Sequence, residues 1–189
     1  SCNIALGNNT HSFINSSACF NTSVGQEAGR GIKDGNYNTF LGYYAGARCY
    51  VCGDYNLAAG SQAGKCLTDG SRNVFLGAYA ASGNVITGSC NVAIGNEAGN
   101  GLTSGTHNIL LGNKAAGGAT NAGHYNVILG KEAGCSATGA EGNVFLGAYS
   151  GKSISTGDFN VHLGYNSGNT TSSGCKNITI GCNVELPSA

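Results

Sequence analysis

The sequence predicts an all-β fold, a parallel β-solenoid (β-roll) of about eleven coils. Each coil has 17–18 residues and repeats the pattern of the coil before it. Three observations lead to this prediction. One short phrase recurs at a nearly fixed spacing, apolar residues alternate within it, and glycine makes up 33 of the 189 residues. Repeats of this length cannot bury an apolar face alone, so they stack into a continuous core. We expect residues 1–189 to form a single repeat domain.

The repeated phrase is Asn-x-x-apolar-Gly, and successive copies follow one another at 17- or 18-residue steps. Asparagine at a fixed phase suits a ladder, in which each side-chain amide bonds to the neighbouring coil. We expect the ladder to comprise Asn3, Asn21, Asn38, Asn56, Asn73, Asn91, Asn108, Asn126, Asn143, Asn160 and Asn177.

The alternation within the phrase is typical of a short strand with one buried face. The first and third residues after the asparagine are mostly β-branched or aliphatic, as in Val92 and Ile94, whereas the residue between them varies freely. We therefore expect the first and third positions to face the core and the middle position to face outward. A further, mostly apolar column stands eleven positions after the asparagine and includes Ile32 and Cys49.

Composition excludes several classes of partner. The formal net charge is zero, and 10% of the residues are charged, with no run of lysine or arginine. Binding to the phosphates of nucleic acid is therefore not expected. No apolar stretch approaches the ~20 residues that span a bilayer, so no membrane span is expected either.

The nine cysteines are unusual for a chain without a metal motif. Cys2 and Cys19 are separated by one short repeat length, as are Cys49 and Cys66, which places each pair on neighbouring coils. Neighbouring coils lie about 5 Å apart, which is within the Cα separation that a disulfide tolerates. We predict Cys2–Cys19 and Cys49–Cys66 as disulfide rungs. The pairing of the remaining cysteines stays open: Cys52, Cys90, Cys135, Cys175 and Cys182.

Glycosylation sequons add to the evidence on location. Outside the ladder they begin at Asn8, Asn15 and Asn169, which are candidate glycosylation sites. Disulfides and glycans both belong to oxidising compartments. We expect the protein to be extracellular, or on a virion or cell surface.

One group of three residues has side chains that can ligate a metal ion. Cys90, His107 and His124 follow one another at 17-residue steps, so they could stack on three coils and bind zinc or copper. The alternative is that this column accepts any polar residue, since Tyr37 and Lys176 also occupy it. We favour the alternative, and expect no metal and no cofactor. No catalytic triad, phosphate loop or carboxylate pair stands out, so the protein is not expected to be an enzyme.

Aromatic residues are the better lead to function. They follow the strand glycine or occupy the middle of the strand, and we expect them on the surface, where they would contact neighbouring solenoids or stack on sugars. These residues are Phe40, Tyr43, Tyr44, Phe75, Tyr79, Phe145 and Tyr149. We favour contact between solenoids, because a neutral, apolar surface requires cover.

The phrases NTFLGYYAG, NVFLGAYA, NVAIGNEAG and NVILGKEAG resemble two groups of repeats. One is the Asn-Thr-x-x-Gly-Tyr-x-Ala repeat of phage tail-fibre-like and bacterial surface proteins. The other is the β-roll head of trimeric autotransporter adhesins. The resemblance covers essentially the whole chain. It implies parallel β-roll coils, often in trimers, that serve as a stalk or a receptor-binding surface.

Two functions remain as expectations. The first is a structural subunit of an extracellular filament or surface fibre that associates with itself, as a homopolymer or homotrimer. Aromatic faces and solenoid ends without a divergent capping repeat would make the contacts, and disulfides would strengthen them. The alternative is a segment of a tail fibre or adhesin that binds surface glycans or a receptor. An ice-binding role is less favoured, because Thr22 and Thr39 do not continue into a regular threonine column.

Overall fold

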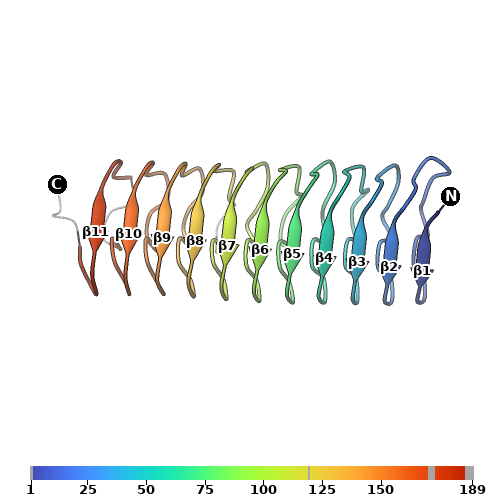
Figure 1. The fold of residues 1–189 in the computed structure, drawn as a ribbon, viewed down its shortest axis with the longest axis horizontal. Helices are drawn as coiled ribbons and strands as arrows, with labels where there is room; N and C mark the ends of the chain where they lie inside the picture. The colour runs from blue at the N-terminus through green and yellow to red at the C-terminus, as the bar shows by residue number, and fades with distance from the viewer. Residues whose placement is uncertain (1, 119, 170–172, 186–189) are drawn as a thin grey trace.

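The computed structural model of the protein describes residues 2–118, 120–169 and 173–185. Eleven three-residue strands form one parallel sheet in sequential order, and no helix occurs in these ranges (Figure 1). The predicted fold class, an all-β parallel solenoid, is confirmed. The strands are β1 (Ile4–Leu6), β2 (Thr22–Val24), β3 (Thr39–Leu41), β4 (Leu57–Ala59), β5 (Val74–Leu76), β6 (Val92–Ile94), β7 (Ile109–Leu111), β8 (Val127–Leu129), β9 (Val144–Leu146), β10 (Val161–Leu163) and β11 (Ile178–Ile180).

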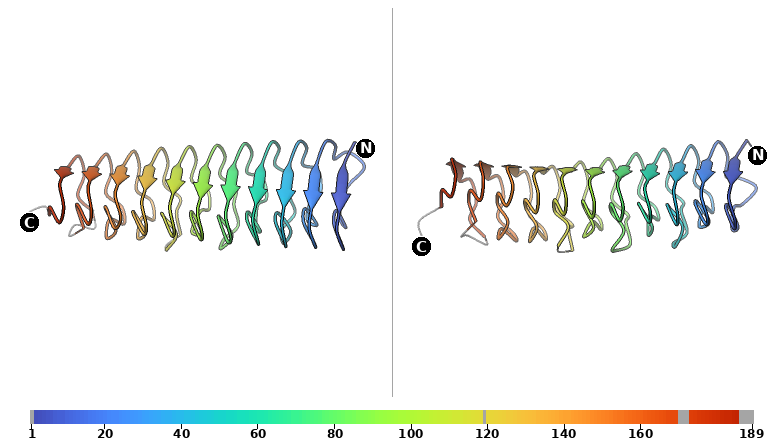
Figure 2. Two further views of the ribbon diagram at one scale, coloured as in Figure 1. Left: turned by 60° about the horizontal axis from the view of Figure 1, so that its bottom comes forward. Right: turned by 90° about the horizontal axis from the view of Figure 1, so that it is seen from below.

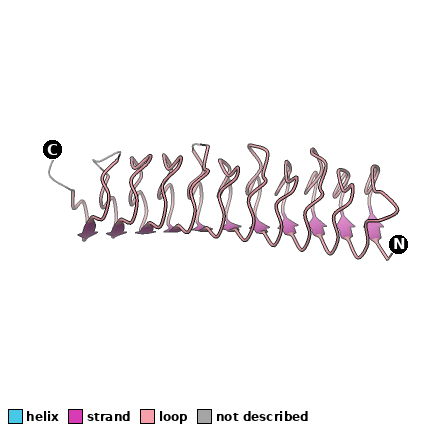
Figure 3. Ribbon diagram, turned by 90° about the horizontal axis from the view of Figure 1, so that it is seen from above, coloured by secondary structure: helices cyan, strands magenta, loops and turns pink. Residues whose placement is uncertain are grey.

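The coils stack into a straight rod with one strand per coil. All strands lie along one long wall, and turns and loops make up the rest of each coil (Figures 2 and 3). Ten steps of about 4.8 Å between paired strands give a sheet about 48 Å long. The ranges given above contain no helix long and apolar enough to cross a bilayer.

The asparagines form a continuous ladder along the inside of the rod. The Asn91 N–H donates to Oδ1 of Asn73 at 2.9 Å, and Asn91 Nδ2 donates to the Gly105 carbonyl at 2.8 Å. The same N–H···Oδ1 bond joins every consecutive pair from Asn3 to Asn177. From Asn21 to Asn160 these side chains are buried, so each amide is satisfied within the protein.

The predicted orientation of the strand residues is wrong. The middle residue of each strand is buried from β2 to β11, and its two neighbours are half-buried or exposed. The physical reason is the ladder itself. Because Asn91 points inward, the two-residue period of a strand turns Ala93 inward and Val92 and Ile94 outward.

A second ladder lies two positions before the asparagines and was not predicted. Here a backbone N–H donates to the side chain at the equivalent position of the next coil. Five of these bonds run from Cys19 to Asn36 (2.8 Å), Asn36 to Asp54 (2.7 Å), Asp54 to Ser71 (3.0 Å), Thr106 to His124 (3.1 Å) and Glu141 to Asp158 (2.8 Å). The position therefore favours side chains that accept a hydrogen bond.

Coil length and core volume vary together over much of the rod. The 18-residue coils that begin at Asn38, Asn73 and Asn108 bury a large residue at mid-strand, and the 17-residue coils before them bury a small one. The large residues are Phe40, Phe75 and Leu110, and the small ones are Ser23, Ala58 and Ala93. Alternation of large and small side chains lets coils only about 4.8 Å apart interdigitate.

The extra residue of the longer coils also shifts the last core position. Ile32 of a shorter coil pairs with Val51 of the following longer coil, and both are fully buried. Cys49, two positions before Val51, is only half-buried. The predicted apolar column is therefore correct at Ile32 and wrong at Cys49, because the longer coil places a different residue in the core.

The glycine that ends each strand is required by the close approach of the coils. Gly95 has φ +135°, and a Cβ there would lie 2.6 Å from the carbonyl oxygen of Gly112 in the next coil. A Cβ on Gly139, in contrast, would have no atom within 4 Å. We expect Gly95→Ala to lower the free energy of unfolding by at least about 2 kcal/mol, because it adds both strain and overlap. Gly139→Ala should change it by less than about 0.5 kcal/mol.

Chemical denaturation followed by circular dichroism measures both values. Equal stabilities of the two variants would contradict the steric role of the strand glycine.

His162 is a titratable residue in the core. It is fully buried, stacks on Phe145 with ring centroids 5.3 Å apart, and shares a 2.6 Å hydrogen bond between Nδ1 and Oγ1 of Thr179. Its Nε2 is buried without a hydrogen-bond partner among the described residues. Burial lowers the pKa of His162 below the ordinary value of 6.5, and the negative charge of Glu185 opposes this only partly.

The lowered pKa makes stability depend on pH. Below pH 6.5 the unfolded chain binds a proton at His162 that the folded chain resists, so stability falls as the pH drops through this value. We expect the thermal midpoint to fall between about pH 7.5 and pH 5.5, and His162→Phe, which continues the stack on Phe145, to reduce that fall. A pH dependence identical in the wild type and the variant would contradict the assignment.

Candidate interaction surfaces

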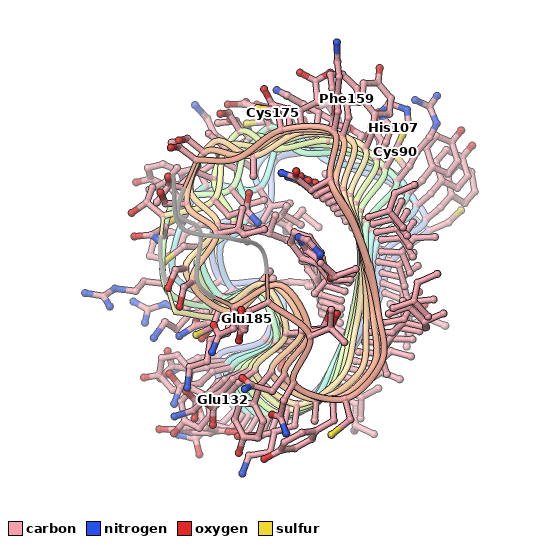
Figure 4. The ribbon with its side chains drawn as sticks, turned by 90° about the vertical axis from the view of Figure 1, so that its left-hand side faces the viewer. Cys90, His107, Glu132, Phe159, Cys175 and Glu185 are labelled. Carbon is pink, nitrogen blue, oxygen red and sulfur yellow. The ribbon has the colours of Figure 1, made fainter. Side chains whose placement is uncertain are left out.

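The structure does not bring the three candidate metal ligands together. Among the described residues, no group of three or more His, Cys, Asp or Glu side chains could hold a metal ion. Cys90 and His107 precede their asparagines directly and lie at one outer corner of the rod (Figure 4). His124 lies one position earlier in its coil, because an 18-residue step separates Asn108 from Asn126. The Nδ1 of His124 accepts the Thr106 N–H, so this histidine belongs to the second ladder.

All nine cysteines are free thiols in the structure, including those of the two predicted rungs. The register that pairs Ile4 with Thr22 places Cys2 level with Phe20, so Cys2 and Cys19 do not share a phase. Cys49 and Cys66 are neighbours whose thiols contact each other. Burial, together with this contact, raises the pKa of Cys49 to about 11.

The predicted aromatic surface is only partly on the surface. Phe40, Phe75 and Phe145 are fully buried at mid-strand positions, so their predicted role in self-association or glycan contact is wrong. The error follows from the inverted strand orientation. The tyrosines that follow the strand glycine do reach the surface: Tyr43 and Tyr79 are exposed, and Tyr44 and Tyr149 are half-buried.

A stack of aromatic rings runs along the corner that precedes the strands. Phe20 stacks on Tyr37 at 4.9 Å, and Tyr37 stacks on Tyr55 at 4.8 Å, with interplanar angles of 11° and 2°. Arg72 continues the row, 5.9 Å from the Tyr55 ring centroid. Because neighbouring rings cover each other's faces, the stack presents ring edges to solvent. A sugar that binds by stacking on an aromatic ring would therefore find a free ring face only at the end of the row.

The outer face of the sheet is a continuous apolar surface. It consists of the first and third residues of every strand, and Thr22 and Thr39 are the only ones with a polar side chain. The first positions are Ile4, Thr22, Thr39, Leu57, Val74, Val92, Ile109, Val127, Val144, Val161 and Ile178, and the third are Leu6, Val24, Leu41, Ala59, Leu76, Ile94, Leu111, Leu129, Leu146, Leu163 and Ile180. Each is half-buried or exposed, and the exposure is largest at Ile178, at 69%. No charged side chain interrupts this face.

A basic groove lies at the opposite end of the strands, where the second to fourth coils turn away from the sheet. It has a cavity volume of about 360 Å³ and is lined by Arg30, Tyr43, Tyr44, Arg48, Gln62 and Lys65. A second cavity of about 250 Å³ adjoins it and shares Arg30, Tyr44 and Arg48.

The candidate glycosylation sites differ in accessibility. Asn8 and Asn15 are exposed, and Asn15 Nδ2 donates to Asp34 at 2.8 Å. Asn169 is half-buried, and its Nδ2 donates to Oδ1 of Asn166 at 2.8 Å.

No protein-family model, curated protein or solved structure matches the chain.

Proposed function

We propose that this chain is a structural rod that associates side by side with further copies of itself through the apolar outer face of the sheet. The observation that carries the proposal is this face, on which every outward position is aliphatic apart from two threonines. The largest apolar patch on a soluble monomer typically measures about 300–600 Å² and is often a functional surface, and this face lies in that range.

A second copy fits the face better than an unrelated partner. Its rows of side chains recur at the same spacing of about 4.8 Å, so the ridges of one copy fit between those of the other along the whole rod. A face about 48 Å long and about 10 Å wide covers ~480 Å² on each copy. The total of ~960 Å² is close to the lower bound of about 1,000 Å² for a specific interface.

The setting we propose is an extracellular or virion-surface fibre, in two or three associated copies. The repeat phrases resemble tail-fibre and adhesin repeats, and the observed fold, a parallel solenoid of 17–18-residue coils, is compatible with a β-roll. A stiff rod whose coils are locked by buried ladders suits a role as a stalk. In this proposal the rod has a structural role and is not an enzyme.

Self-association is tested with Ile94→Lys, which places a charge in the middle of the apolar face. We expect the variant to weaken association by at least about tenfold, because an unpaired charge would be buried between copies. The matched control is Val85→Lys, since Val85 is 53% exposed but lies on a loop away from the strands. Sedimentation velocity over a range of concentrations measures the effect.

The proposal fails if the wild-type protein remains monomeric at high concentration, or if both lysine variants reduce association equally. Circular dichroism establishes that each variant retains the fold.

We also propose that Cys49 and Cys66 form the disulfide rung. With diamide as oxidant, the two thiols lose two protons and two electrons to form one S–S bond, and diamide is reduced to its hydrazine. The pKa of about 11 at Cys49 keeps the thiol protonated at neutral pH, so oxidation should speed up as the pH rises. Tryptic mapping should show peptide 49–65 linked to peptide 66–72.

Cys66→Ser should abolish this link, and Cys52→Ser should retain it. Recovery of peptide 66–72 unlinked after oxidation of the wild-type protein would contradict the rung.

A further inference from the structure

The basic groove is built from consecutive coils. Arg30, Arg48 and Lys65 come from the second, third and fourth coils, and the groove also contains Tyr43 and Tyr44. Since successive coils lie about 4.8 Å apart, three cations converge on one side of the rod within about 10 Å. This is a local concentration of charge on a chain whose formal net charge is zero.

The groove is held in place by its own contacts. Arg30 Nη1 donates to Oε2 of Glu27 at 2.7 Å, and Lys65 Nζ donates to Oε1 of Gln62 at 2.8 Å. The hydrogen bond from Arg30, together with one from Tyr44, lowers the pKa of Glu27, so this carboxylate stays ionised at neutral pH. Glu27 therefore accepts hydrogen bonds from both Arg30 and Tyr44 at the edge of the groove.

Two cations remain without a carboxylate partner. Within the described part of the chain, the ion pairs are Arg30–Glu27, Lys114–Glu97 and Lys152–Glu132, so neither Arg48 nor Lys65 has one. Arg48 is exposed at the groove and has no hydrogen bond from its guanidinium to another described residue. A planar guanidinium binds oxyanions through paired N–H donors.

The two tyrosines provide an aromatic surface beside the cations of the groove. Tyr43 and Tyr44 meet edge to face, with ring centroids 4.5 Å apart, and Tyr43 is 48% exposed. Unlike the rings of the aromatic stack, Tyr43 has no ring stacked parallel to it among the described residues. It can therefore contact an apolar ring face beside the cations. The cavity of about 360 Å³ is large enough for one sugar-sized unit.

We propose that this groove binds an acidic sugar unit, with its oxyanion held by Arg48 and Lys65 and its ring against Tyr43. The oxyanion can be a carboxylate, a sulfate ester or a phosphate ester, because all three offer acceptors of similar geometry to a guanidinium. The site is separate from the apolar sheet face, so it does not depend on self-association.

The test uses four probes that share one ring: glucose, glucuronate, glucose 6-sulfate and glucose 6-phosphate. Titrations followed by chemical shifts of the protein report affinity and location together. We expect at least one acidic probe to bind at least about tenfold more tightly than glucose. The order of the three acids identifies the source of the oxyanion.

Variants locate the site. Arg48→Gln and Lys65→Gln should each weaken binding of the preferred acid by at least about tenfold. Arg72→Gln removes the same charge from the corner beside Tyr55 and should leave binding unchanged. Ile94→Lys should also leave it unchanged, which separates this site from the self-association face.

Equal affinity for glucose and all three acids would overturn the proposal. So would equal weakening by Arg72→Gln and Arg48→Gln, because binding would then reflect the overall charge alone.

Discussion

The structure depends on one constraint: each coil must meet the next at the same phase, and the buried asparagine ladder enforces it. Asn91 receives no water, so its amide must bond to Asn73 and to the Gly105 carbonyl. A coil displaced by one residue would leave these groups unsatisfied, at about 1–3 kcal/mol for each group. Because the bond recurs along the rod, the register of every strand follows from the one before.

The ladder also determines which strand residues point outward, and therefore makes the outer face of the sheet apolar. An inward asparagine turns the middle strand residue inward and leaves Val92 and Ile94 outward. The same interaction that aligns the coils therefore creates the face that we propose for self-association. The inward orientation of the asparagine side chain therefore links the stability of the rod to its proposed assembly.

The fold class could be predicted from the sequence, because an eleven-fold repeat of one phrase with glycine at a fixed phase fits few architectures. The orientation of the strands could not be read from apolar alternation alone. Phe75 and Val74 are both apolar, and only the inward position of Asn73 distinguishes them. Spacing was equally insufficient for the cysteine and histidine sites. A single extra residue between coils moves Cys19 and His124 out of the phase that a count by the shorter repeat assigns to them.

The same variation in coil length shows where the rod can carry specific chemistry. Positions on the two ladders accept few side chains, and the strand glycines accept none other than glycine. The third coil is one of the longer ones, and its additional length lies in the loop around Arg48 and Tyr50, which lines the basic groove. Arg48, Tyr43 and Lys65 serve neither ladder, so they can change without disturbing the register. A recognition site on this kind of rod is therefore expected at the loops of its longer coils rather than on the repeated framework.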